Sequence, residues 1–365
     1  MERKIRVGVV FGGKSTEHAV SLLSAQSIIR TLDPERFEMV FIGIDKEGRW
    51  ALCDNARPLL HADDPEQIAL CPSAHPVAVV PGGSEQRLSV LTDSHRATPI
   101  DVVFPVLHGP LGEDGTVQGM LKLANLPFVG AGVLGSAVGM DKDVAKRLLR
   151  DAGIPVANFL AVNARHAVTL TYDEVVTRLG SPFFIKPANA GSSVGVSKVT
   201  NTEDYATALR EALKFDTKVL IEEFIEGREI ECAVLGNDEP TASCLGEIIP
   251  THDFYSYEAK YLDEHGALLK IPAEIEQGTG EHLRRLAVQT FQTLCCEGMA
   301  RVDFFLRPNG KAIVNEINTI PGFTSISMYP KLWEASGLPY GKLVERLIDL
   351  ALERHEREQR LQTSI

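Results

Sequence analysis

Short apolar runs, separated by stretches with helical periodicity, make up the first third of this chain. The runs predict buried strands over residues 5–11, 37–44 and 101–107. A Gly-Gly turn follows the first run, and a helix is predicted to begin near Ser15. Strands that alternate with helices predict an α/β fold with a parallel sheet, whose ligands collect beyond the carboxyl ends of the strands. His108 and Glu113 follow one such end.

The later part of the chain continues to mix helical and strand patterns. A charged helix is expected from Met140, and a Gly/Ser-rich stretch follows the next apolar strand. The pattern then predicts strands near 182–187, 218–224 and 229–235, helices near 202–214 and 281–296, a hairpin over 301–318, and a terminal helix. Residues 251–261 are typical of a loop. Residues 52–96 show little periodicity, and no function is assigned to them.

The hairpin over residues 301–318 predicts a metal site. Both arms alternate apolar and polar residues around an Asn309-Gly310 turn signal, which pairs Asp303 with Glu316 and Arg301 with Asn318. These four side chains share one face, and the opposite face takes Val302, Phe304, Ile313 and Ile317. Two carboxylates and an amide oxygen suit a hard cation such as Mg²⁺. The alternative is an ordinary solvated sheet face.

Two segments are candidates for binding phosphate. Residues 8–15 match G-x-x-x-x-G-K-[ST], but the intervening residues are the end of an apolar strand, whose amides pair within a sheet. A P-loop is therefore disfavoured there. The second candidate is Lys186 with the Gly/Ser-rich residues 191–195, where glycines allow close backbone approach and lysine supplies charge. A plain hairpin loop is the alternative at this second segment.

Composition limits the class of protein. The chain has 365 residues, 44% of them hydrophobic, so it can bury a large core in two or three domains. Its formal charge of −12 argues against a nucleic-acid or anionic-membrane surface. The six cysteines form no CxxC pair, and no signal peptide or 18-residue apolar run is present. We therefore expect a soluble cytoplasmic protein with reduced thiols.

Several motifs resemble the ATP-grasp carboxylate–amine ligases, specifically the D-alanine–D-alanine ligase family. They are FGGKSTEHAVS, LHGPLGEDG, KPANAGSSVGV, IEEFIEGREIE, FYSYEAKY, GMARVDFF and NEINTIPGFTSISMYP. The resemblance covers essentially the whole chain and is weakest over 52–96. It implies a Rossmann-like parallel-sheet domain over 1–130 and two α+β ATP-grasp subdomains, a central one over 131–222 and a C-terminal one over 223–365.

The resemblance also implies the reaction. ATP phosphorylates the carboxylate of one D-alanine, and the amine of a second attacks the acylphosphate to give D-alanyl-D-alanine for peptidoglycan. Two Mg²⁺ ions are implied, with Mn²⁺ as a possible substitute, and a homodimer is expected. A closing lid is expected over 251–261, because water would hydrolyse the acylphosphate.

Site residues follow from motif position. The resemblance assigns ATP to Lys142, Lys186, Ser193, Glu222, Glu229 and, in the lid, Lys260. It assigns the metal to Asp303, Glu316 and Asn318, in agreement with the hairpin argument. The first D-alanine is assigned to Glu17, helped by Ser192 and Tyr261, with His108 nearby. Arg301 and the Gly322 N–H would stabilise the oxyanion, and Ser327 would bind the second D-alanine's carboxylate.

One departure and three alternatives remain. Family members usually carry an acid where this chain has Ala19; that acid could close a capping box with Thr16, so its absence leaves the local helix start open. A catalytically silent ATP-binding regulator would lack Glu17, Arg301 or Ser327, and all three are present. A P-loop NTPase would need a second acid-ended strand near residues 8–15. A D-alanine–D-lactate ligase usually lacks the tyrosine found here at Tyr261.

Overall fold

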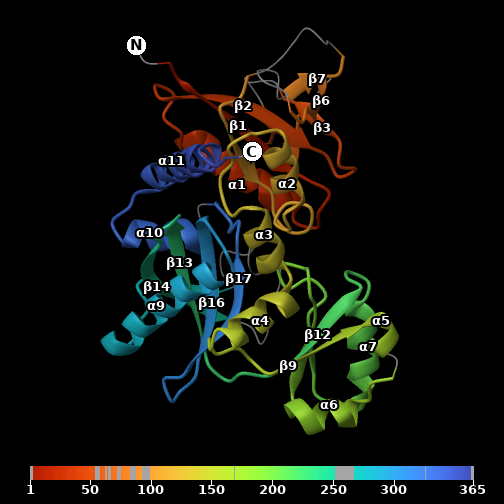
Figure 1. Cartoon of the computed structure of the whole chain (residues 1–365). Coiled ribbons are helices and arrows are strands. Elements are labelled where there is room, and N and C mark those ends of the chain that lie inside the picture. The colour runs from red at the N-terminus through yellow and green to blue at the C-terminus, as the bar shows by residue number, and fades with distance from the viewer. Residues whose placement is uncertain are drawn as a thin grey trace.

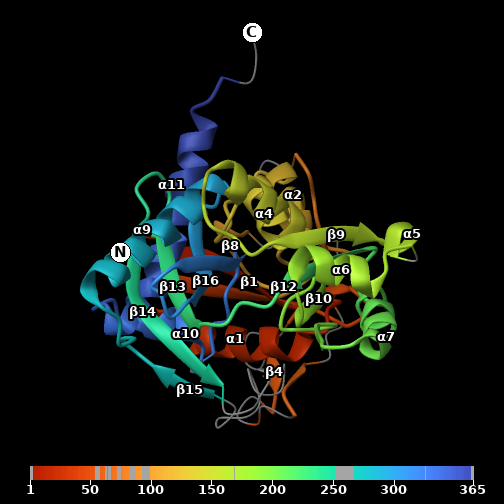
Figure 2. The same cartoon turned by 90° about the horizontal axis from the view of Figure 1, so that it is seen from below.

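In the described part of the chain, the computed structural model has three larger β-sheets, a small two-stranded one, and helices packed on them. The central and C-terminal sheets lie side by side, and the N-terminal sheet lies across their common end (Figure 1 and Figure 2). The structure describes residues 3–53, 58–61, 64, 67–71, 75–82, 88–92, 99–167, 169–250, 267–324 and 326–362. Within these ranges no helix is long and apolar enough to cross a membrane.

The N-terminal sheet has a parallel core, as the sequence predicts. Strand β1 (Ile5–Gly12) pairs in parallel with β2 (Phe37–Ile44) on one side and β8 (Val102–Val106) on the other. Three antiparallel strands extend the sheet: β3 (Trp50–Leu52), β6 (His75–Val79) and β7 (Leu88–Val90). A separate pair is formed by β4 (Leu59–Leu60) and β5 (Ala69–Leu70). Apart from the start of β3, these strands lie in the segment 52–96, which shows no clear periodicity. The sheet is therefore mixed.

Helix α1 (His18–Thr31) follows the glycine turn after β1 and packs on this sheet. The helix begins at His18, and its N-cap residue Glu17 makes no side-chain capping hydrogen bond. Helix α2 (Thr116–Leu123) follows β8. Both the turn after β1 and the loop after β8 therefore lie at the carboxyl ends of parallel strands, where the sequence places ligands.

The central sheet runs in the order β11 (Ser197–Val199), β10 (Phe183–Pro187), β12 (Lys218–Glu223), β9 (Phe159–Asn163). Helices α5 (Ala164–Ala167), α6 (Tyr172–Leu179) and α7 (Thr202–Ala212) accompany it. Alternation along β10 divides the sheet into two faces. Phe183 and Ile185 enter the core, whereas Phe184 and Lys186 line a cavity on the opposite face.

The C-terminal sheet runs β15 (Ala267–Lys270), β14 (Thr241–Pro250), β13 (Arg228–Gly236), β16 (Gly298–Leu306), β17 (Ala312–Asn318). One face packs on α9 (Gln277–Thr293) and on α4 (Lys142–Asp151), which follows α3 (Val133–Met140). Helices α10 (Met328–Ala335) and α11 (Tyr340–Gln359) then lead back to the N-terminal sheet, where Leu343 and Leu347 share a core with Phe104 (Figure 1).

The three-part division of the chain at 130 and 222 stays a proposal. Each part contains one of the three larger sheets, and the first part also holds the two-stranded pair β4–β5. Two helices, however, pack on a part to which they are not assigned. Helix α4 contributes Ala145 and Leu149 to the C-terminal core, and α11 contributes to a core shared with the N-terminal sheet. The parts are therefore joined by common cores as well as by the chain.

The predicted hairpin forms, with a correction to its register. Asp303 pairs with Glu316 and Arg301 with Asn318, as the alternation predicts. A β-bulge at Asn315 then shifts the pairing, so that Phe304 faces Val314. The prediction that Ile313 shares a face with Val302 is wrong for this reason. Val314 takes that place in the core, and Ile313 is buried on the opposite face with Ile225 and Phe305.

Candidate active site

Two adjoining cavities hold most of the predicted site residues. The larger, about 340 Å³, lies between the central and C-terminal sheets, and the smaller, about 80 Å³, lies below the loops of the N-terminal sheet. Gly191, Ser192 and Glu316 line both. The larger cavity takes Lys142, Lys186, Ser193, Glu222 and Glu229, and the smaller takes Glu17, His108, Arg301, Asn318, Gly322 and Ser327.

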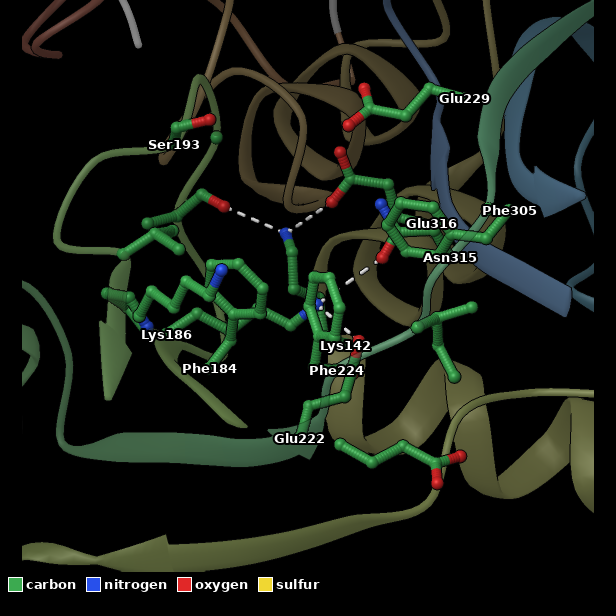
Figure 3. A pocket seen from close by; sticks show the side chains of 18 of the residues that line it. Lys142, Phe184, Lys186, Ser193, Glu222, Phe224, Glu229, Phe305, Asn315 and Glu316 are labelled. Carbon is green, nitrogen blue, oxygen red and sulfur yellow. Dashed lines mark hydrogen bonds and ion pairs between the residues drawn. The ribbon is translucent and has the colours of Figure 1, made fainter. Parts of the chain in front are cut away.

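Lys142 lies at the first position of α4, where the cap fixes its place. The Asp141 side chain caps this helix by accepting hydrogen bonds from the Asp143 and Val144 amides. Lys142 Nζ donates to the Ala190 carbonyl oxygen at 2.8 Å and pairs with Glu316 at 3.2 Å (Figure 3). Burial opposes the charge on Lys142, but Glu316 and other carboxylates raise its pKa above the usual value. The lysine is therefore a firmly charged cation beside the shared wall.

Lys186 and Glu222 lie opposite each other deeper in the larger cavity. Lys186 Nζ donates to Glu222 Oε1 at 2.9 Å and to Asn315 Oδ1 at 3.4 Å (Figure 3). The second carboxylate oxygen of Glu222 pairs with Lys146 at 2.9 Å, a lysine that sequence reasoning missed. Burial acts to raise the pKa of Glu222, but the two ammonium groups lower it below its usual value.

Apolar side chains form part of the lining of the larger cavity. They are Phe184, Phe224 and Phe305, which Figure 3 labels, and Ile225. The rings of Phe184 and Phe224 lie 6.2 Å apart, and Lys198 Nζ is 4.7 Å from the Phe224 ring centre. A flat apolar slot beside lysines suits a nucleotide base linked to phosphates. Sequence reasoning missed these residues, although aromatic side chains on the polar face of a strand are the available signal.

The Gly/Ser-rich loop joins the two cavities. Ser192 and Ser193 adopt positive φ angles of 50° and 60°, a left-handed conformation that is uncommon for serine. This turn aims the Ser192 hydroxyl at Glu17, to whose Oε1 it donates a hydrogen bond. A Cβ on Gly191 would lie 2.8 Å from Glu17 Oε2. The absence of a side chain at Gly191 therefore allows the carboxylate to sit against the loop backbone.

His108 lines the smaller cavity and is held at both ring nitrogens. Nδ1 lies 3.0 Å from the Ile320 carbonyl oxygen, which can only accept, so Nδ1 carries the proton. Nε2 therefore accepts a hydrogen bond from Ser24 Oγ at 3.1 Å, and Ser24 Oγ in turn accepts one from the Phe323 amide. Burial lowers the pKa of His108 to about 4, against the weaker opposite effect of the Ile320 carbonyl. The imidazole is therefore neutral at pH 7.

Glu113 is buried beside His108 and holds the same loop. Its Oε2 accepts from the Gly109 amide at 2.7 Å and its Oε1 from the Ile320 amide at 3.1 Å. Burial, together with the nearby Glu17 carboxylate, raises the pKa of Glu113 to about 8. The loop after β17 is thus held by hydrogen bonds from the N-terminal part of the chain.

Arg301 is the centre of an ionic network on the shared face of the hairpin. It binds both carboxylate oxygens of Asp303 at 2.7 Å and lies 2.9 Å from Glu231, which the sequence argument missed. Asn318 Nδ2 donates to Asp303 at 3.0 Å. Glu231, Asp303 and Glu316 form one row across β13, β16 and β17. The guanidinium is therefore fixed by charge-assisted, partly bidentate contacts.

The same sheet face carries donors that suit a metal ion. Asp303, Glu316 and Asn318 offer two carboxylates and an amide oxygen on one sheet face, which is the oxygen-rich donor chemistry of Mg²⁺. Among the described residues, no three His, Cys, Asp or Glu side chains converge as a ready-made metal site. Ion binding would therefore need Asp303 to turn from Arg301, and Asn318 to present its oxygen. The donor set fits under those conditions.

Ser327 lies at the start of α10, on the far side of the smaller cavity. Its Oγ accepts from the Thr324 amide at 3.0 Å and contacts Thr324 Oγ1 at 2.8 Å. Gly322 lines the same cavity. Two further predicted residues, Lys260 and Tyr261, and the predicted lid over 251–261 lie outside the described residues.

The P-loop alternative at residues 8–15 does not match the geometry. Strand β1 is paired on both sides, so the amides of Val9, Val10 and Phe11 belong to the sheet. The Gly13 amide donates to the Ile44 carbonyl oxygen at 2.8 Å. Lys14 is exposed and lines neither cavity. Residues 8–15 thus belong to the sheet and its turn, whereas Lys142 and Lys186 line the larger cavity.

A cavity with three lysines, a glycine-rich loop and an apolar slot, placed between two antiparallel sheets, is the arrangement expected of an ATP-grasp ligase. Two family models match the chain: "D-ala D-ala ligase N-terminus" over residues 6–131 and "D-ala D-ala ligase C-terminus" over residues 148–349. The chain belongs to the D-alanine–D-alanine ligase family.

The relatives match this chain over nearly its full length. The chain is 56% identical over 362 residues to D-alanine–D-alanine ligase A of Escherichia coli K12, covering 99% of this chain and 100% of that one. Among solved structures, the D-alanine–D-alanine ligase of Coxiella burnetii matches with a TM-score of 0.85 and 40% identity, covering 98% of this chain and 97% of that one. The VanG D-Ala:D-Ser ligase of Enterococcus faecalis matches with a TM-score of 0.83 and 36% identity, covering 96% and 100%.

Proposed function

We propose that this protein joins two D-alanines to D-alanyl-D-alanine, with cleavage of ATP, to supply a precursor of the peptidoglycan cell wall. The observation that carries the proposal is the contact between the two cavities at Gly191, Ser192 and Glu316. A nucleotide in the larger cavity presents its terminal phosphate at that wall, and an amino acid in the smaller one presents its carboxylate from the other side.

Phosphoryl transfer activates the carboxylate. The first D-alanine binds with its ammonium at Glu17, and its carboxylate oxygen attacks the γ-phosphorus, so that ADP leaves and D-alanyl phosphate forms. Lys142 and Lys186 bind the phosphates, Ser193 lies in the glycine-rich loop beside them, and Glu222 and Glu229 bind the adenosine. Asp303, Glu316 and Asn318 would hold Mg²⁺, which would offset charge on the phosphates; we propose two ions, with Mn²⁺ able to substitute.

Amide formation follows in the smaller cavity. The free amine of the second D-alanine, whose carboxylate binds Ser327, attacks the acyl carbon. The amine loses a proton and inorganic phosphate leaves. Arg301 and the Gly322 N–H stabilise the tetrahedral oxyanion, where losing one donor typically costs about 3–4 kcal/mol. The ionic contact of Arg301 with Glu231 at 2.9 Å supports this role, because it can hold the guanidinium while Asp303 turns to the metal.

Water must stay out while D-alanyl phosphate exists. We assign the lid to residues 251–261, with Lys260 reaching the terminal phosphates and Tyr261 closing the first substrate site against Glu17 or Ser192. His108, neutral and held at both nitrogens, lies beside the first D-alanine without adding charge. We further propose that the protein acts on small-molecule substrates only, that it forms a homodimer, and that it is located in the cytoplasm.

The test is release of inorganic phosphate from ATP and Mg²⁺ with a defined set of acceptors. D-Alanine alone should support release together with stoichiometric D-alanyl-D-alanine, and L-alanine should not. D-Lactate or D-serine added to D-alanine should compete poorly. Depsipeptide formed as readily as dipeptide would reassign the second substrate to a D-hydroxy acid. ATP binding without turnover on any acceptor would favour the silent regulatory alternative.

A further inference from the structure

A buried lysine without a role in the proposed reaction lies under the nucleotide cavity. Lys146 is only 1% exposed, and its Nζ lies 2.9 Å from Glu222 Oε2. Glu222 is itself 4% exposed, and its other oxygen, Oε1, accepts from Lys186 Nζ at 2.9 Å. Two ammonium groups thus bracket one carboxylate in the interior.

The helix explains how Lys146 reaches this place. It lies four residues after Lys142 on α4, so both lysines extend from the same side of the helix. Lys142 reaches Glu316 at the shared wall, and Lys146 reaches Glu222 on β12. In the described part of the chain, Glu222 is the one carboxylate within ion-pairing distance of Lys146. Because this buried cation pairs with a single carboxylate, its role is to be sought at Glu222.

The charges around Glu222 indicate what the role of Lys146 is. Lys146, Lys186 and Glu222 together carry one excess positive charge, which suits a cavity that receives phosphates. Lys186 differs from Lys146 because it lines the cavity, so it is the lysine that a nucleotide contacts. Once Lys186 turns to a phosphate, Glu222 loses one of its two cations. A buried carboxylate left with no counter-charge would be strongly unfavourable.

We propose that Lys146 is a positioning residue that holds Glu222 in place, so that Lys186 can exchange this carboxylate for the nucleotide phosphates. The inference rests on the proposed function, because it needs ATP in the larger cavity. Without Lys146, Lys186 stays tied to Glu222, and binding phosphate then requires breaking the last ion pair of a buried acid. Lys146 thus lowers the cost of ATP binding while touching neither ATP nor D-alanine.

A purely structural role is the competing explanation. The Lys146–Glu222 pair joins α4 to β12, and its loss would then lower stability and all activities together. The two explanations differ in what the loss of Lys146 changes: the structural role affects stability, ATP and D-alanine together, whereas the positioning role weakens ATP binding alone and does so through the charge of Glu222. Lys146→Met and Glu222→Gln, singly and combined, separate them. Glutamine keeps a carbonyl oxygen that can accept from adenine.

The experiment measures binding of a non-hydrolysable ATP analogue with Mg²⁺ by calorimetry, together with Michaelis constants for ATP and D-alanine. Lys146→Met should weaken analogue binding by about 10- to 100-fold, with the D-alanine constant within about twofold of the parent. Lys146→Arg, which keeps the cation, should retain most of the affinity. Lys342→Met, which removes an exposed lysine paired with Glu345, is the matched control.

The decisive comparison is made in the Glu222→Gln background. Adding Lys146→Met there should leave analogue affinity unchanged within about threefold, because no carboxylate remains to be held. A further loss of tenfold or more would overturn the inference. So would equal weakening of ATP and D-alanine constants in Lys146→Met. This background also decides the matter if Lys146→Met alone does not fold, because the double variant buries no charge at this pair. Parent protein that fails to bind the analogue would instead refute the proposed function.

Discussion

Replacing Gly191 by alanine tests the contact between the glycine-rich loop and the first D-alanine site. An alanine Cβ would lie 2.8 Å from Glu17 Oε2 and 3.3 Å from Oε1, so the carboxylate must move by about 0.6 Å to restore an ordinary 3.4 Å contact. It has little room to do so, because Gly109 encloses it on another side and a Cβ there would lie 2.5 Å from Oε2. Glu17 is also hydrogen-bonded by Ser192.

The magnitude follows from what the shift removes. In the proposed reaction Glu17 binds the ammonium of the first D-alanine through a charge-assisted hydrogen bond. Such bonds contribute about 1.5–3 kcal/mol, and each 1.4 kcal/mol is tenfold in affinity, so the Michaelis constant of the first D-alanine should rise about 10- to 100-fold. Gly191 is not at a positive φ, so alanine introduces no backbone strain there.

The assay is phosphate release at saturating ATP over a wide range of D-alanine, with thermal unfolding measured in parallel. Gly119→Ala is the matched control, because it lies within α2 with no atom within 4 Å of an added Cβ and should be neutral or stabilising by up to about 1 kcal/mol. A Michaelis constant for D-alanine within twofold of the parent value in Gly191→Ala would refute the reasoning. An equal rise in the Michaelis constant for ATP would assign the effect to the glycine-rich loop instead of Glu17.

Three further predictions test other parts of the site. Lys186→Ala should weaken ATP binding by about tenfold or more while Lys14→Ala has no effect, and equal losses measured by calorimetry would revive the P-loop alternative. Tyr261→Phe should slow dipeptide synthesis by about 5- to 100-fold and make D-alanine–D-lactate formation detectable; unchanged product ratios would remove this role for its hydroxyl. His108 has a pKa of about 4 in the fold, below the unfolded value, so its contribution to stability is complete above pH 6.5 and is lost as the pH falls to 4. Chemical unfolding should show the parent losing about 3 kcal/mol more than His108→Gln over that range, and parallel pH curves would contradict it.

The hairpin shows how far sequence reasoning reaches. Strict alternation was enough to pair Asp303 with Glu316, because side chains on a strand change face at every residue. The bulge at Asn315 had no signal in the alternation, and it reversed the faces of Ile313 and Val314. It also has a consequence in the site, because the Asn315 side chain reaches Lys186. Pairing near the functional residues was predictable, whereas the local irregularity was not.

The N-terminal sheet gives a second example. Three apolar runs predicted its parallel strands β1, β2 and β8, because fully buried strands are apolar throughout. The antiparallel extension from residues 52–96 was not predicted, since its strands are too short to show a period. The same sheet explains why the motif at 8–15 is misleading: a pattern of residue types does not reveal whether the amides between them are already paired.

The sequence by itself determined which residues carry charge, which strands bury one face, and the order of motifs that identifies the family. Those properties are local, because a period or a motif spans only a few residues. The tertiary structure decided which of these residues meet. Ser192 contacts Glu17 across 175 positions of chain, and Lys146 is buried against Glu222, only because separate sheets and helices pack together. Contacts of this kind depend on the distance and angle between elements, which no local pattern encodes.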